Sequence, residues 1–123
     1  MKSLLAFALF LSFAYAQEFM AYYSKNCGCC EIYFSKLERE GFRIKRVQVN
    51  GDKLMEMKSQ FGVPPDLRSC HTMVYEDRFI EGHVPPEGIR KVIKDKNLKG
   101  VASPHGIKSG KGEYEDGYFL IRR

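Results

Sequence analysis

The apolar and polar positions of the chain switch several times between the period of a strand and the period of a helix. Residues 18–26 are rich in aromatic side chains that favour β-structure, which predicts a strand. From residue 30 to Gly41 the apolar side chains recur at helical spacing, and the glycine suits the end of a helix. Residues 42–50 alternate as a strand does, and residues 52–62 return to the helical pattern. The first half therefore predicts the order β-α-β-α.

The second half predicts a β-hairpin followed by a helix. Residues 71–75 and 78–84 have the pattern of two strands on either side of a short turn. Pro85 then opens a helix, because proline is tolerated in the first helical turn. Residues from Gly100 onward are glycine-rich and predict a loop, with residues 117–123 as a candidate edge strand. The resulting order, β-α-β-α-β-β-α, is that of a thioredoxin-like α/β fold.

The N-terminus has the features of a cleavable signal peptide. Lys2 precedes an apolar run that ends in Ala-Tyr-Ala at residues 14–16, which has the small-x-small form of a signal peptidase site. The run is shorter than the ~20 residues that span a bilayer, and an N-terminal membrane anchor is the alternative. We expect residues 1–16 to be removed and residues 17–123 to form one thioredoxin-like domain. This domain would be periplasmic or secreted, with no stable membrane insertion after cleavage.

Size and charge limit the class of protein. The 107 residues left after removal of 16 from 123 suit one compact domain with a modest core. Loss of Lys2 lowers the net charge from +5 to +4, and the basic side chains are spread among glutamates. Export and this mixed surface argue against nucleic acid as a partner. The sequence also lacks a paired acid–base set and a glycine-rich phosphate loop, which favours a binding protein over an enzyme.

Three of the four cysteines stand within four consecutive positions. Cys27, Cys29 and Cys30 fall at the start of the first predicted helix, where free amides and the helix dipole favour thiolate over thiol. In a thioredoxin-like fold, the loop that enters the third strand lies beside this helix end. That loop carries Cys70 and His71, so we expect all four cysteines and one histidine to converge.

Disulfide chemistry gives two interpretations of the cluster. A structural bridge fits an exported chain, but bridges from Cys29 to either neighbouring cysteine would be strained, and only a bridge from the cluster to Cys70 is comfortable. Alternatively, Cys27 and Cys30 form the Cys-x-x-Cys pair of an exported thiol–disulfide oxidoreductase. Against this, Cys29 would invite scrambling, and Cys70-His71 replaces the proline that thioredoxins carry before the third strand.

Soft-metal binding is the third interpretation. Thiolates with imidazole suit Cu(I) or Zn²⁺, and zinc sites more often use two spaced Cys-x-x-Cys pairs. Consecutive sulfurs can instead bridge several Cu(I) ions, because a thiolate can be shared and Cu(I) accepts low coordination numbers. The spacing therefore favours metal binding over redox chemistry. It also slightly favours copper over zinc, with more than one Cu(I) ion bound.

Three motifs of the chain closely resemble those of the CopG-like family. They are Cys-Gly-Cys-Cys at 27–30, Ser-Cys-His-Thr at 69–72 and Glu-Gly-His-Val-Pro at 81–85. Members are small exported thioredoxin-like proteins associated with copper resistance, and the resemblance spans residues 19–94. It implies a protein that sequesters, relays or oxidises copper, with another exported copper-handling protein as a candidate partner. The copper ligands that it implies are Cys27, Cys29, Cys30, Cys70 and His71, with His83 as a further candidate.

The chain departs from the family pattern near its C-terminus. Relatives tend to carry a methionine in a Gly-Met-Pro loop, where this chain has Ala-Ser-Pro-His-Gly over residues 102–106. A thioether from that loop is therefore missing, and His105 is a candidate to stand in for it, although a lone loop histidine is commonly just solvated. Met55 and Met57 stand two apart on a predicted helix and face different sides, so at least one of them belongs to the core.

Overall fold

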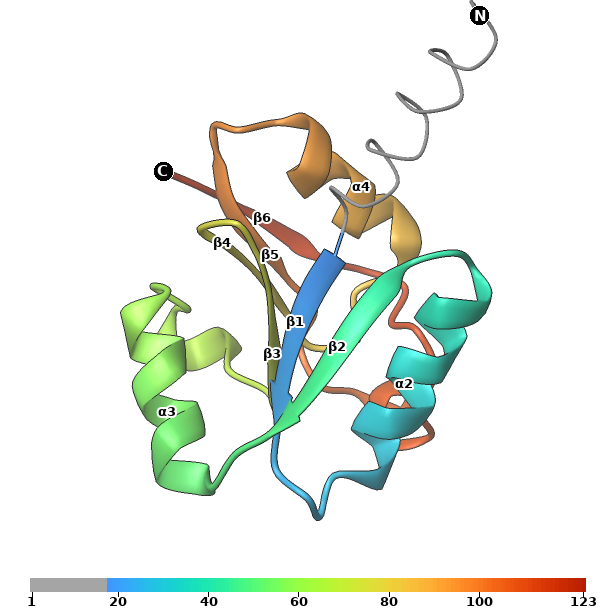
Figure 1. Cartoon of the computed structure of the whole chain (residues 1–123). Helices are drawn as coiled ribbons and strands as arrows, with labels where there is room; N and C mark the ends of the chain where they lie inside the picture. Colours follow the sequence, from blue (N-terminus) through green and yellow to red (C-terminus); the bar gives the residue numbers. More distant parts are fainter. Residues whose placement is uncertain (1–17) are drawn as a thin grey trace, which may run out of the picture.

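Six strands form one mixed β-sheet, with helices on both of its faces (Figure 1). The computed structural model describes residues 18–123, so the predicted signal peptide and Gln17 lie outside the described residues. The strands are β1 (Glu18–Tyr23), β2 (Arg43–Gln48), β3 (His71–Tyr75), β4 (Arg78–Glu81), β5 (Leu98–Ala102) and β6 (Phe119–Arg122). The helices are α2 (Gly28–Arg39), α3 (Gly51–Gln60), α4 (Pro86–Lys94) and the short α5 (Ile107–Gly110), with a 3-10 turn at Pro65–Leu67. Within residues 18–123, none of the helices has the length and apolar character needed to cross a membrane.

Apart from β5, the strands follow one another along the chain in the order that the sequence predicts. The sheet order is β2-β1-β3-β4-β5-β6, with β1 parallel to β2 and antiparallel to β3. Strands β3 and β4 form the predicted hairpin. Helices α2 and α4 share one core with the sheet, and α3 lies on the opposite face (Figure 1). The predicted thioredoxin-like order β-α-β-α-β-β-α is confirmed, and so is the C-terminal edge strand, which is β6.

The helical periodicity of α2 explains why this helix packs on the sheet. The four side chains of α2 that recur at helical spacing are all 0% exposed. They are Cys30, Tyr33, Phe34 and Leu37. Because Cys30 is one of them, the packing that fixes the helix also fixes the inner end of the cysteine motif.

The prediction of a loop from Gly100 onward is wrong for two segments. Residues 98–102 form β5, which pairs with β4 in parallel, and residues 107–110 form α5. Residue 100 must be glycine because of packing, since a Cβ there would lie 2.6 Å from the Phe79 ring. This glycine therefore does not indicate a flexible loop. Composition alone could not distinguish this close contact from a loop.

Gly82 allows a close contact between two segments that carry site residues. It adopts a positive φ of 81°, and a Cβ at this position would lie 2.2 Å from the backbone oxygen of Ser103. The Gly82 carbonyl also accepts a hydrogen bond from His71 Nε2 at 3.1 Å. A side chain at residue 82 would therefore push apart the end of β4 and the segment after β5.

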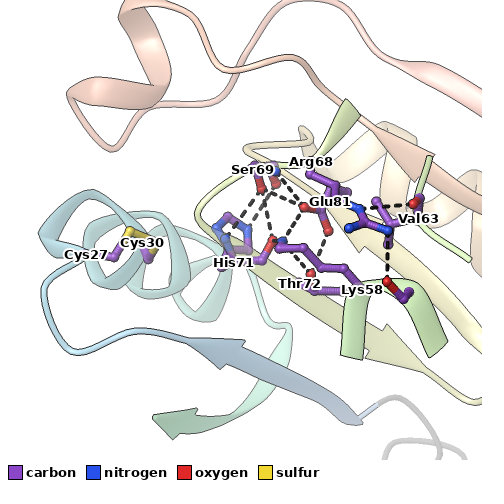
Figure 2. A network of polar contacts seen from close by, with 11 residues as sticks. Cys27, Cys30, Lys58, Val63, Arg68, Ser69, His71, Thr72 and Glu81 are labelled. Carbon is purple, nitrogen blue, oxygen red and sulfur yellow. Dashed lines mark hydrogen bonds and ion pairs between the residues drawn. A yellow bond between two sulfur atoms is a disulfide. The ribbon is translucent and has the colours of Figure 1, made fainter. Parts of the chain in front are cut away.

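A buried ion pair joins α3 to the sheet (Figure 2). The side chains of Lys58 and Glu81 are 1% and 0% exposed, and the ammonium contacts the carboxylate directly. Lys58 Nζ also donates to Thr72 Oγ1 at 2.7 Å and to the His71 carbonyl at 3.0 Å. Glu81 accepts further bonds from Thr72 Oγ1 and from the Ser69 amide, both at 2.7 Å. The burial of these charges is thus compensated by hydrogen bonds on both partners.

We expect Gly82→Ala to lower the free energy of unfolding by at least ~2 kcal/mol, because a Cβ meets backbone at a left-handed φ. Urea denaturation measures this change. Gly28→Ala is the control, since a Cβ at Gly28 meets nothing within 4 Å. Equal stabilities of the two variants would contradict the account of this contact.

We expect Lys58→Met to destabilise the fold by ~3–5 kcal/mol, because it leaves the Glu81 carboxylate buried without its charge partner. The double variant Lys58→Met/Glu81→Gln should recover part of this loss, since the amide is neutral and keeps an oxygen acceptor for the Ser69 amide. Urea denaturation of both variants provides the measurement. A double variant no more stable than Lys58→Met would rule out charge burial as the cause.

Candidate metal centre

The cysteine motif forms the N-terminus of α2. Cys27 is the N-cap residue, and its amide donates to the Ser24 carbonyl at 3.1 Å in the preceding turn. The sulfurs of Cys27, Cys29 and Cys30 lie within 4.8 Å of one another. The helix start thus gathers three soft donors at the positive end of the helix dipole.

The sulfurs are not all free thiols. Cys27 and Cys30 form a disulfide, with their Cα atoms 5.3 Å apart, and the Cys27 and Cys29 sulfurs are 3.6 Å apart. Cys29 and Cys70 are free. The expectation that only a bridge to Cys70 would be comfortable is therefore wrong, because the first turn of α2 brings the Cys-x-x-Cys pair within bonding distance.

Cys70 reaches the same pocket from the loop before β3. This pocket, called the thiol pocket below, lies between the starts of α2 and α3 and is lined by Cys27, Cys29, Cys70, His105, Met55 and Lys58, among others. The pKa of the Cys70 thiol is raised by burial and by the neighbouring Cys29, and the Lys58 ammonium opposes this rise. The structure thus brings together Cys29 and Cys70, which are 41 positions apart in sequence.

His71 and His83 lie behind the cysteine motif, in the core. His71 is 0% exposed and His83 is 1% exposed, and their ring centroids are 5.4 Å apart. In Figure 2, His71 lies between the Cys27–Cys30 bridge and the Lys58–Glu81 ion pair. Neither ring belongs to the group of donor atoms within 4.8 Å, which among the described residues contains three cysteines alone.

The hydrogen bonds of these rings determine their tautomers. His71 Nε2 contacts the Gly82 carbonyl at 3.1 Å, and His83 Nδ1 contacts the Glu113 carbonyl at 3.0 Å. Because a carbonyl can only accept, each ring must donate through that nitrogen. The other nitrogens, His71 Nδ1 and His83 Nε2, are buried and have no hydrogen-bond partner among the described residues. Each of these two nitrogens therefore has a free lone pair. The opposite nitrogen of each ring donates to a backbone carbonyl, which is typical of metal-binding histidines.

Burial keeps both imidazoles neutral. It places the pKa of His71 well below its ordinary value, and it also lowers the pKa of His83. A neutral ring is the form that can bind a metal ion. Tyr33 supports the pair, because its ring stacks on His83 with centroids 4.5 Å apart and lies 5.2 Å from His71.

His105 lies at the outer side of this group. Its ring centroid is 6.3 Å from that of His83, and the residue lines the thiol pocket. The Glu115 carboxylate holds the His105 loop by accepting bonds from the amides of Gly106 at 2.9 Å and Ser109 at 2.8 Å. His105 is thus exposed, as expected of a lone loop histidine, while its loop is held beside the thiol pocket.

Three residues that matter to the geometry were not singled out by the sequence. Tyr33 is one of the apolar positions of α2, and nothing marks it as a support for histidines. Glu81 is the first residue of the Glu-Gly-His-Val-Pro motif, but nothing in the sequence marks it as the partner of a buried lysine. The sequence could have indicated that Lys58 is buried, since this residue follows Leu54 by four positions and so falls on the buried face of α3. A lysine on such a face requires a buried partner.

The chain is similar to known proteins in sequence and in fold. Residues 67–110 match the family described as "Protein of unknown function, DUF411". A solved structure of copper resistance protein CopG, form 2, is 33% identical, with a TM-score of 0.75, and the match covers 86% of this chain and 89% of that one. Form 1 is 36% identical, with a TM-score of 0.66 and coverages of 71% and 68%. No curated protein sequence matches significantly. Because the match to form 2 combines this identity with nearly full coverage of both chains, the chain belongs to the CopG-like family.

Proposed function

We propose that the protein is an exported copper-binding protein that holds Cu(I) in a cysteine and histidine site. One observation carries the proposal: cysteines from two distant segments line one pocket, and His71 and His83, buried in the core, each keep a ring nitrogen without a hydrogen-bond partner. Solved structures of a copper resistance protein share the fold and a third of the sequence, which supports copper as the metal. The predicted signal peptide supports a periplasmic or secreted location.

The oxidation state of the cysteine motif sets the number of sulfur ligands. With the Cys27–Cys30 bridge intact, the free thiols are Cys29 and Cys70. Reduction of the bridge by two electrons and two protons gives four thiols, of which Cys27, Cys29 and Cys70 line the thiol pocket and Cys30 is buried beside it. Thiolates are favoured at the start of α2 and are soft ligands that suit Cu(I). Four clustered thiolates can bridge more than one Cu(I) ion, so we assign the binding function to the reduced protein.

The histidines complete the site from the core side. The lone pairs of His71 Nδ1 and His83 Nε2 are neutral donors already oriented by backbone hydrogen bonds. Imidazole is a good ligand for copper. We therefore assign Cys27, Cys29, Cys30 and Cys70 as the principal ligands, and His71 and His83 as supporting ligands.

Thiol–disulfide exchange is the second candidate function. The Cys27–Cys30 bridge at a helix N-terminus favours it, since a Cys-x-x-Cys pair in this position is the reactive element of disulfide oxidoreductases. The two functions differ in their need for Cys70, which lies outside the Cys-x-x-Cys pair.

We expect the reduced mature protein to bind more than one equivalent of Cu(I) and to prefer Cu(I) to Zn²⁺. An anaerobic titration against a chromophoric Cu(I) chelator measures the endpoint, and near-ultraviolet absorption reports thiolate-to-copper charge transfer. The protein with its bridge intact is the matched control and should bind fewer ions, because two of its four sulfurs are not thiols. An endpoint of one equivalent, with zinc competing effectively, would argue against shared thiolates.

We expect Cys70→Ser to weaken Cu(I) binding about as much as Cys27→Ser does, because a hydroxyl oxygen is a poor ligand for this soft ion. The same titration gives the comparison, and thermal melts check that both variants fold. If the protein is instead a thiol–disulfide oxidoreductase, the two variants should differ in a disulfide-reduction assay. There, Cys70→Ser would keep the activity of the parent and Cys27→Ser would lose it, with copper binding unaffected by either substitution.

A further inference from the structure

One methionine of α3 faces the thiol pocket while another on the same helix faces the core. The side chain of Met55 is 48% exposed and lines the pocket. Met57 is 8% exposed. Residues two apart on a helix point in different directions, so both cannot pack on the sheet. Met55 therefore places an unbranched, polarisable thioether beside the cysteines without gaining core burial.

The imidazole of His105 is a second candidate ligand for Cu(I), and it comes from another segment of the chain. It lines the same pocket as Met55, and its loop follows β5, whereas Met55 follows β2. No hydrogen bond engages the His105 ring within residues 18–123, although Glu115 holds the backbone of the loop. The ring is thus placed by its loop and remains available to a ligand.

The residues of the pocket form an ordered set of donors. The starts of α2 and α3 lie at the same end of the sheet (Figure 1), and the pocket lies between them. Met55 is half exposed, Cys29 is of intermediate exposure, and Cys70 is exposed. Thioether and thiolate ligands both select Cu(I), and the negatively charged thiolate holds the cation more strongly. Affinity for Cu(I) should therefore rise from the thioether of Met55 to the thiolates of Cys29 and Cys70.

We propose that Met55 and His105 form a receiving site for Cu(I) at the mouth of the thiol pocket. An incoming ion binds the thioether and the imidazole, and it then exchanges these neutral ligands for the thiolates of Cys29 and Cys70. Copper remains Cu(I) throughout, so no electron moves in this exchange. The proposal rests on the copper-binding function proposed above and adds the route by which the metal reaches the cysteines.

A loading experiment tests the receiving site. Reduced protein is mixed with a coloured Cu(I)–bicinchoninate complex in an anaerobic stopped-flow instrument, and the rate of colour loss gives the rate of transfer. We expect Met55→Leu and His105→Gln each to slow loading about tenfold, as loss of a supporting contact to a metal typically does. The final number of ions bound should equal that of the parent. Met57→Leu is the matched control and should load at the parent rate.

Each other outcome has a defined meaning. A parent protein that takes up no Cu(I) would overturn the proposed function and the receiving site with it. A parent that binds Cu(I), with Met55→Leu loading at its rate, would overturn the receiving site alone. A lower endpoint for Met55→Leu would make Met55 a permanent ligand and would also overturn the proposal. Equal slowing by Met57→Leu would attribute the effect to the packing of α3.

An NMR experiment tests whether the Met55 thioether contacts the metal, independently of the rate of loading. Methionine methyl groups labelled with carbon-13 are observed by NMR in the bridged protein, and Ag(I) serves as a soft, redox-inert substitute for Cu(I). Substoichiometric Ag(I) should shift the Met55 methyl signal, which is identified by its loss in Met55→Leu. The Met57 signal should stay in place. A spectrum in which the Met55 signal does not move would show that the thioether does not contact the metal.

Discussion

The buried ion pair between Lys58 and Glu81 is the interaction on which the site depends. It connects α3 to the hairpin strand β4, and through the Ser69 amide it also holds the loop that precedes β3. Cys70 is the next residue of that loop. Two charges in the core are stable only while each keeps its partner and its hydrogen bonds. The same bonds that stabilise the fold therefore keep Cys70 opposite the start of α2.

A second constraint comes from the backbone carbonyls that face the histidines. Gly82 and Glu113 each accept a ring N–H, which leaves one bare nitrogen on His71 and one on His83. A buried polar atom without a partner is costly, so its retention needs a compensating role. The metal binding proposed above would supply such a role, and proton transfer is less suited to it because burial holds the pKa of His71 well below its ordinary value.

The two candidate functions use the same few sulfurs in different oxidation states. The Cys27–Cys30 bridge leaves two thiols for a metal, whereas its reduction releases two more. Under the proposed function, redox chemistry of the bridge would therefore change the capacity for Cu(I). Lys58 lies at the wall of the pocket, where its ammonium partly opposes the rise in the pKa of Cys70 that burial and the neighbouring Cys29 produce.

The sequence by itself determined the order of the elements and the segments that carry the chemistry. Local periodicity was sufficient because α2 buries one face, and the burial of Tyr33, Phe34 and Leu37 follows directly from their spacing. It did not determine β5, since Gly100 is required by a contact with the Phe79 ring that is distant in sequence. It named Cys27 and Cys30 only as the pair of an alternative interpretation and did not decide between this pair and a bridge to Cys70, because the choice depends on the geometry of the first turn of α2. The lone pairs of the histidines, the Lys58–Glu81 pair and the position of Met55 at the pocket were decided by tertiary structure, because each depends on which distant groups the packed sheet brings within a few ångströms.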